Sequence, residues 1–155
     1  FLPPPNSLSS NCIGALKLDF NCFRYLGQTT NTPDALIMAR DQCFNNDNGD
    51  RPNARNIAIL ITDGVPYPGD RRQPAIDIAK TIRENDTSIL AIGITNEVDM
   101  DFLKQVSSLP QVEGKQFFQA PAFTDLSSVL AEVTTGSCEE TTPSGIFRLN
   151  FVPNL

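Results

Sequence analysis

The segment that most constrains the fold is an apolar run over residues 57–61 (IAILI), which gives way at once to Thr62, Asp63 and Gly64. A short apolar run rich in isoleucine is typical of a strand buried on both faces, as in a parallel sheet covered by helices. Ligands of open parallel sheets bind beyond the carboxyl ends of the strands. Asp63 is therefore a candidate ligand-binding residue, although a simple turn at Gly64 explains the same residues.

Apolar periodicity predicts further strands and helices in alternation between residues 56 and 136. Buried strands are expected at residues 88–95 and 116–119, and helices at residues 33–44, 73–84, 99–107 and 124–136. The expected helix N-caps are Thr32, Asp99 and Thr124, and Gly136 is expected to end the last helix. Alternating strands and helices predict an α/β fold, doubly wound, with a mostly parallel sheet and helices on both faces.

Composition limits the classes of function. The 155 residues suit one domain, and the net charge of −6 argues against a nucleic-acid partner. The sequence has no histidine, which excludes a Ser-His-Asp triad and a histidine-ligated zinc site. It also lacks G-x-S-x-G and a glycine-rich phosphate loop, so a small hydrolase or phosphotransferase that uses Asp63 is a disfavoured alternative and no enzyme activity is expected. No apolar run is long enough to span a membrane, and no signal peptide is visible.

The cysteine pattern favours an extracellular, secreted protein. Cys12, Cys22, Cys43 and Cys138 form no C-x-x-C pair, so structural disulfides outside the cytosol are favoured over zinc or redox chemistry. Buried free thiols are the alternative, and four cysteines leave three disulfide pairings open. Asn85 begins an Asn-Asp-Thr sequon, which makes it a glycosylation candidate in a secreted chain.

Several motifs, taken in order, resemble von Willebrand factor type A domains. Residues 25–36 (YLGQTTNTPDAL) resemble the Gly-Thr-Asn-Thr segment of that family, and residues 59–64 (ILITDG) resemble its central strand. Residues 89–94, 117–118 and 123–133 resemble the later strands and the last helix, and Cys138 resembles a cysteine that often closes the domain. The likeness covers residues 23–138 and is closest to matrilins and non-fibrillar collagens. It implies a partial A domain there, with residues 1–22 unassigned and residues 139–155 as a linker or loosely packed tail.

The resemblance also implies a divalent-cation site. Adhesive members of the family bind a cation through Asp-x-Ser-x-Ser, a threonine in a second loop and the aspartate of Thr-Asp-Gly. By resemblance, Thr30 and Asp63 are the second and third of these groups, and their oxygens suit Mg²⁺. The Asp-x-Ser-x-Ser string is absent. The metal-ion-dependent adhesion site is therefore expected to be incomplete, either because the front of the domain is missing or because the site has decayed.

The resulting expectation is an extracellular adhesion module that binds a matrix protein or another protein ligand. Its loop face would include Gly64, Arg71 and Arg72, with the arginines contacting an acidic partner; a solvated loop is the alternative for these residues. The competing function is a structural matrix component without metal-dependent binding. A truncated sheet would leave the central strand with an unpaired edge, so self-association of a marginally stable chain is also expected.

Overall fold

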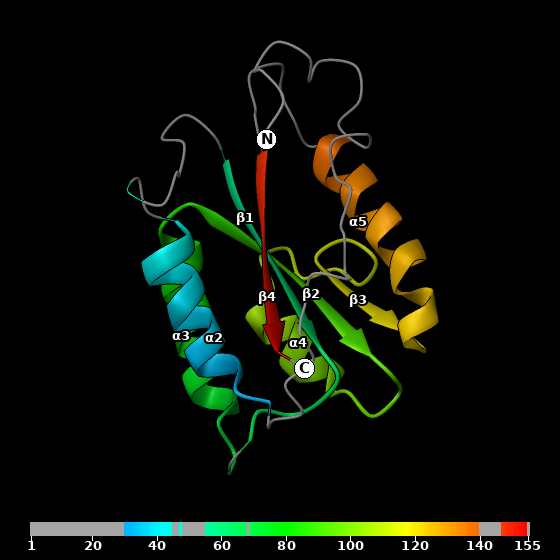
Figure 1. Ribbon diagram of the computed structural model, residues 1–155, viewed down its shortest axis with the longest axis horizontal. Coiled ribbons are helices and arrows are strands. Elements are labelled where there is room, and N and C mark those ends of the chain that lie inside the picture. Colours follow the sequence, from blue (N-terminus) through cyan, green and yellow to red (C-terminus); the bar gives the residue numbers. More distant parts are fainter. Residues whose placement is uncertain (1–29, 45–46, 48–54, 68, 140–146, 155) are drawn as a thin grey trace.

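Four parallel strands form the centre of the computed structural model, which describes residues 30–44, 47, 55–67, 69–139 and 147–154. The strand order is β3-β2-β1-β4, with every neighbouring pair parallel (Figure 1). The strands are β1 (Arg55–Thr62), β2 (Thr87–Ile94), β3 (Phe117–Ala120) and β4 (Phe147–Asn154). The predicted parallel α/β sheet is confirmed. β2 and β3 follow on one side of β1, whereas β4 lies on the other side of it.

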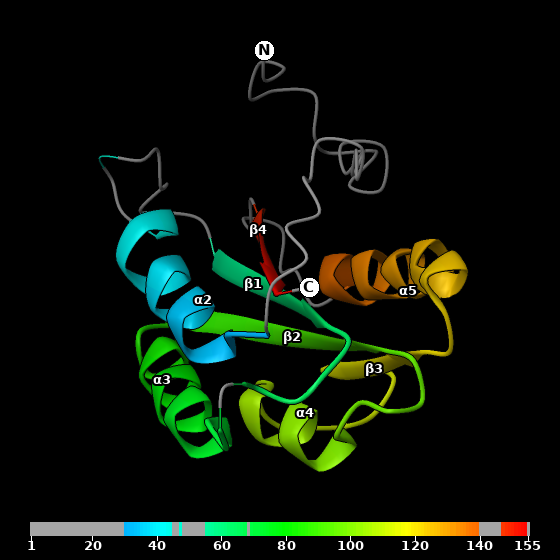
Figure 2. The ribbon, with the colours of Figure 1, turned by 60° about the horizontal axis from the view of Figure 1, so that its bottom comes forward.

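Helices cover both faces of this sheet. Figure 2 shows α3 and α4 on one side and α5 on the other, with α2 beside α3. The helices are α2 (Thr32–Met38), the π-helix η2 (Ala39–Cys43), α3 (Arg72–Glu84), α4 (Met100–Val106), the 3-10 turn η4 (Phe123–Asp125) and α5 (Leu126–Glu139). Both faces are therefore covered by helices, as a doubly wound sheet requires.

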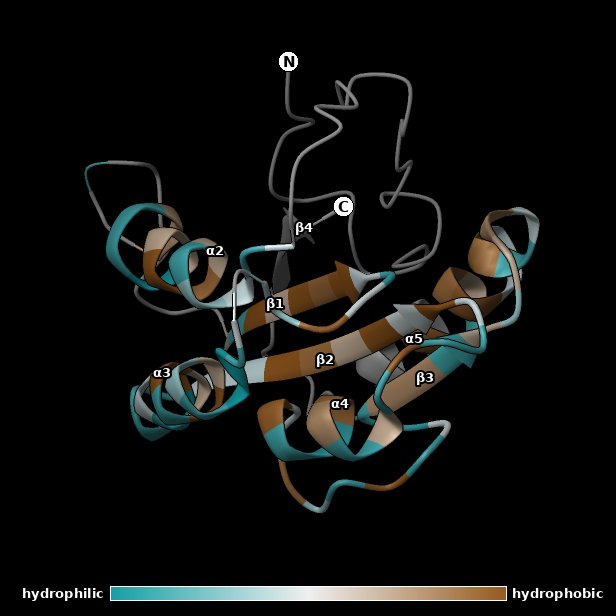
Figure 3. Ribbon diagram, turned by 90° about the horizontal axis from the view of Figure 1, so that it is seen from below, coloured by the Kyte–Doolittle hydropathy of each residue, from teal (hydrophilic) through white to brown (hydrophobic). Residues whose placement is uncertain are grey.

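Each face of the sheet carries its own apolar core, because successive strand residues point to opposite faces. On one face, Ala58 and Leu60 of β1 pack with apolar residues of α2, α3 and α4. On the other, Ile57, Ile59 and Ile61 pack with Leu126, Leu130 and Val133 of α5. Figure 3 shows the apolar colouring along both central strands. This two-sided burial explains why the apolar run in β1 does not alternate with polar residues.

The helix ends differ from the sequence-based expectations in three places. The first helix has Asn31 rather than Thr32 at its N-cap position, and Thr32 is fully buried as the first helical residue. Thr124 lies inside the 3-10 turn η4 and does not cap α5, which continues through Gly136 to Glu139. Asp99 does cap α4, since its side chain accepts a hydrogen bond from the backbone N–H of Phe102. A glycine costs only about 1 kcal/mol inside a helix, so Gly136 does not have to end one.

The largest difference lies in the C-terminal segment, where a linker or loosely packed tail was expected. Residues 147–154 instead form β4, which pairs with β1 over its full length, from Arg55 opposite Phe147 to Thr62 opposite Asn154. The expectation that the central strand lacks a neighbour is therefore wrong, because β1 has β2 on one side and β4 on the other. Within the described residues, none of the helices is both long and apolar enough to cross a membrane.

Candidate functional site

The end of β1 places Asp63 at the carboxyl edge of the sheet, directly after Thr62. The Thr62 hydroxyl is buried and donates to the Gly64 carbonyl at 3.2 Å, while the Gly64 N–H approaches the same hydroxyl at 3.4 Å. These contacts fold the chain into a tight turn around Asp63. Its side chain is half-buried, so the carboxylate stands at the rim of the sheet where a ligand can reach it.

The second predicted metal ligand, Thr30, lies next to this turn. A Cβ placed on Gly64 would stand 3.5 Å from the Thr30 hydroxyl oxygen, which puts that hydroxyl against the Gly64 backbone. The backbone N–H of Tyr67 donates to the Thr30 carbonyl at 2.7 Å and joins the two loops directly. The structure therefore brings together the loops that carry Thr30 and Asp63, although they are more than thirty residues apart in sequence.

Arg71 connects the loop between β1 and α3 to the start of α2. Its guanidinium donates to the Asn31 side-chain oxygen at 2.6 Å and to an Asp34 carboxylate oxygen at 3.2 Å. The Asn31 amide in turn donates to the other Asp34 oxygen at 2.6 Å. These three side chains form a closed polar ring, so the position of the Thr30 loop depends on the loop that precedes α3.

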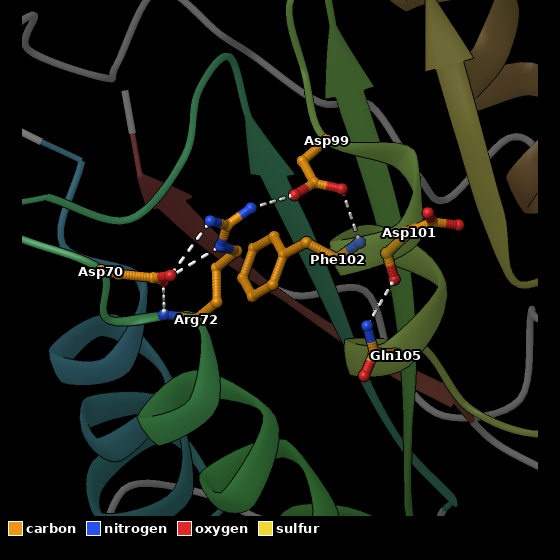
Figure 4. Close-up of polar contacts among 6 residues, drawn as sticks. All are labelled: Asp70, Arg72, Asp99, Asp101, Phe102 and Gln105. Carbon is orange, nitrogen blue, oxygen red and sulfur yellow. Dashed lines mark hydrogen bonds and ion pairs between the residues drawn. The ribbon is translucent and has the colours of Figure 1, made fainter.

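Arg72 connects the loop between β1 and α3 to the N-terminus of α4 (Figure 4). Its guanidinium donates to an Asp99 oxygen at 2.6 Å and to both oxygens of Asp70 at 3.0 Å. The other Asp99 oxygen accepts the backbone N–H of Phe102 at 3.0 Å. That N–H and the Arg72 guanidinium lower the pKa of Asp99, and the bonds from Arg72 lower the pKa of Asp70. Both carboxylates are thus held in the charged form that pairs with Arg72.

The chemistry available at this edge is a small set of oxygen ligands. Within the described part of the chain, the Asp63 carboxylate makes no hydrogen bond or ion pair, so it remains available to a cation or a donor group. No cluster of three or more His, Cys, Asp or Glu residues that could hold a metal occurs among those residues. One carboxylate and one hydroxyl fit Mg²⁺, because that ion retains several water molecules and uses one or two carboxylates from a protein.

Two exposed apolar residues flank this pair of oxygen ligands. Val65 is 37% exposed and Tyr67 is 58% exposed, on the same loop as Asp63 and Gly64. Exposed aromatic side chains beside a few polar groups are a common composition of protein-binding surfaces. We refer to Thr30, Asp63, Gly64, Val65 and Tyr67 as the top-loop site.

The remaining predicted site residues lie elsewhere. Cys43 is half-buried and forms no disulfide with any of the described residues. Cys12 and Cys22 lie outside the described residues, and so does the side chain of Cys138 on α5, so the disulfide pairing stays a prediction. Asn85 is exposed at the C-terminus of α3, where its amide donates to the Thr81 carbonyl at 2.8 Å. Its glycosylation also stays a prediction.

Sequence patterns did not identify the four acidic or amide residues that bond to Arg71 and Arg72. They are Asn31, Asp34, Asp70 and Asp99. Asp99 had a recognisable signal, but only as a helix cap. Its ion pair with Arg72 spans 27 residues, and no periodicity in the sequence specifies a contact of that separation. Asp70 lies two residues from Arg72, which alone does not distinguish an ion pair from two solvated charges.

Comparison with known proteins identifies the family. A family model described as von Willebrand factor type A domain matches residues 15–132. The chain is 32% identical over 114 residues to the collagen alpha-1(XII) chain of Oryctolagus cuniculus, covering 74% of this chain and 17% of the collagen chain. It is 30% identical over 120 residues to matrilin-1 of Gallus gallus, covering 77% of this chain and 22% of matrilin-1. It is 26% identical over 106 residues to integrin alpha-2 of Bos taurus, covering 66% of this chain and 9% of the integrin.

The chain thus spans at most about a fifth of the length of these relatives. Among solved structures, proximal thread matrix protein 1 of the mussel byssus shares the fold, with a TM-score of 0.62 and 24% identity over 71% of this chain and 27% of the mussel chain. The family model covers well over half of the sequence, and the sheet, the two helical layers and the Thr-Asp-Gly turn after β1 agree with it. The chain belongs to the von Willebrand factor type A domain family.

Proposed function

We propose that this chain is an extracellular protein-binding module that uses the top-loop site, assisted by a divalent cation held by Thr30 and Asp63. The observation that carries the proposal is the Asp63 carboxylate, which is half-buried and has no polar partner in the described part of the chain. It stands in a turn whose neighbour Gly64 lies against the Thr30 hydroxyl. A half-buried carboxylate next to a loop that carries a hydroxyl suits a hydrated Mg²⁺ ion that still has open coordination positions.

The cation would link the two partners. Thr30 and Asp63 would hold it on one side, and a carboxylate of the ligand would occupy an open position on the other. Exposed Tyr67 and Val65 would supply apolar contact around that central charge. Matrix and adhesion proteins are among the relatives of the chain, and this kinship supports an extracellular, non-enzymatic role.

Arg71 and Arg72 have a different role in this proposal from direct contact with an acidic partner. Their guanidinium groups bond to Asn31 and Asp34 in one case, and to Asp70 and Asp99 in the other. We infer that they hold the loop that carries Gly64 and Tyr67 between α2 and α4. A partner would then meet a loop that is already ordered, which lowers the entropy cost of binding.

Calorimetric titration of the chain with Mg²⁺, Mn²⁺ and Zn²⁺ tests the cation site. Zn²⁺ is included because one solved structure of the mussel protein, with a TM-score of 0.60, is described with zinc in its adhesion motif. With only two protein ligands, we expect saturable binding with a dissociation constant of about 1 mM. Asp63→Ala should abolish it, whereas Asp77→Ala, which removes an exposed carboxylate on α3, should not. Equal binding by both variants, or no saturable binding by the parent chain, would refute the cation site.

The competing function is a structural matrix component with no metal-dependent binding. Binding of the chain to an immobilised extract of extracellular matrix proteins, with and without EDTA, separates the two roles. Binding that EDTA and Asp63→Ala both remove supports the adhesive role. Binding that survives both treatments supports the structural one.

A further inference from the structure

The turn between α3 and β2 contains the one Asn-x-Ser/Thr sequon of the sequence, Asn85-Asp86-Thr87, whose middle residue is not proline. Asn85 is the C-cap residue of α3. The backbone of Asp86 is in the left-handed region, with a φ of 54°, a conformation that aspartate adopts more readily than most residues. The chain thus reverses at Asp86, and Asn85 lies outside both the helix and the strand.

The side chain of Asn85 is exposed among polar neighbours. Asp86 is exposed as well, and so are Thr81 and Glu84 on the last turn of α3. The Asn85 amide nitrogen donates a hydrogen bond to the Thr81 carbonyl at 2.8 Å. This nitrogen carries two hydrogens, so a sugar can replace one of them while the other keeps the bond. A glycan attached here would leave the end of α3 in place.

The hydroxyl of the sequon belongs to Thr87, the first residue of β2, which is 5% exposed. It donates to the Asn85 carbonyl at 3.4 Å. In the secretory pathway the oligosaccharide is transferred to the nascent chain before it folds, when this hydroxyl is accessible. Burial of Thr87 in the fold therefore does not prevent the modification, and the exposure of Asn85 lets the folded chain keep a bulky glycan.

The sequon and the top-loop site lie at opposite ends of the sheet. β2 begins at Thr87, and near its other end Gly93 pairs with Thr62 of β1. Thr62 directly precedes Asp63. The strands are parallel, so the six residue steps from Thr87 to Gly93 separate the two ends by about 20 Å.

We propose that Asn85 carries an N-linked glycan, which covers the amino end of the sheet and leaves the top-loop site free. The proposal rests on the extracellular role proposed above, because this modification occurs in chains that enter the secretory pathway. A bulky, hydrated glycan keeps other proteins away from the surface that carries it. A protein ligand would then approach the module from the carboxyl edge of the sheet, where Asp63 lies.

Secretion of the full 155-residue chain from mammalian cells, behind a cleavable signal peptide, tests the modification. The secreted chain should migrate more slowly in gel electrophoresis, and peptide-N-glycosidase F should remove the shift. Because this enzyme converts a glycosylated asparagine to aspartate, peptide mapping should find that conversion at residue 85. Asn85→Gln and Thr87→Val should each abolish the shift, whereas Thr87→Ser, which preserves the sequon, should retain it.

A parent chain without the shift would overturn the proposal. If little chain is secreted, digestion of the cell-retained chain with endoglycosidase H gives the same readout, because transfer precedes export. Neither readout involves a cation, so a glycosylated chain that binds no Mg²⁺ would refute the proposed cation site and still support the glycan.

Hydrogen exchange before and after glycan removal tests where the glycan lies. Differences should be confined to peptides that contain the turn between α3 and β2. Differences in peptides that contain residues 63–67 would contradict a glycan that leaves the top-loop site free.

Discussion

Among the four glycines whose surroundings the structure describes, Gly93 of β2 is the one where an added Cβ has least room. A Cβ on this residue would stand 2.5 Å from a Val98 methyl carbon and 2.6 Å from a Leu103 methyl carbon. Both neighbours are buried, at 6% and 0% exposure, so neither can move into solvent. Overpacking a core by one methyl group costs about 1–3 kcal/mol. Because two short contacts come from different segments, we expect a cost near the upper end of that range. About 0.5–1 kcal/mol of it is offset, since alanine loses less backbone entropy than glycine on folding.

We therefore expect Gly93→Ala to lower the free energy of unfolding by about 2 kcal/mol, which corresponds to a fall in Tm of about 4–8 °C for a chain of this size. Urea denaturation and calorimetry measure both quantities. Gly64→Ala is the matched control, because the nearest atom to its Cβ is 3.5 Å away. In a double-mutant cycle with Val98→Ala, the two changes should cost about 1 kcal/mol less together than their sum. A Gly93→Ala variant as stable as the parent would refute this account of the packing.

Two further predictions concern the ion pair of Asp99 and the packing of α5 on the sheet. The Phe102 N–H and the Arg72 guanidinium lower the pKa of Asp99 below its ordinary value of 3.8. The charged carboxylate therefore stabilises the fold above pH 3.8, and this stabilisation is lost as the pH falls through the folded-state pKa of Asp99. Urea unfolding should accordingly show Asp99→Asn costing more at pH 7 than at pH 2, and Asp99→Ala costing about 1 kcal/mol more again through the lost cap; a cost independent of pH would contradict the ion pair. Leu130→Ala should lower the free energy of unfolding by about 2–5 kcal/mol, because Leu130 is 4% exposed and packs between α5 and the sheet. Ser128→Ala, on the exposed side of α5, should lower it by less than about 0.5 kcal/mol. Similar losses in the two variants would mean that α5 does not pack as described.

The sequence was informative wherever a local pattern determines the structure. The apolar run of β1 and the helical spacing of α3 and α5 predicted these elements, because burial on two faces or on one stripe leaves a periodic signature. Asp99 was predicted as a cap because N-cap preference is a local property. The same apolar run predicted the position of Asp63, which the structure places directly after β1 at the carboxyl edge of the sheet. The resemblance to A domains added Thr30 as a second candidate residue.

The sequence was uninformative wherever structure depends on distant partners. The eight residues of β4 have an unremarkable apolar pattern, and only their pairing with β1 makes them a strand. The partners of Arg71 are 37 and 40 residues away, and a pair of adjacent arginines is equally compatible with a solvated loop. Glycine at position 136 was read as a helix end, but tertiary packing of α5 outweighs a propensity cost of about 1 kcal/mol.

The most direct test of the cation site is paramagnetic relaxation by trace Mn²⁺ in the ¹⁵N-labelled chain. The two proposed oxygen ligands, Thr30 and Asp63, lie on loops joined by the Tyr67–Thr30 backbone hydrogen bond, so one ion bound by both would have to affect both loops together. We predict that the amide signals of Thr30, Asp63 and Gly64 broaden first and in parallel, and that Asp63→Ala removes this selectivity. Broadening centred on other carboxylates, or on one of the two loops alone, would contradict a shared site at the end of β1.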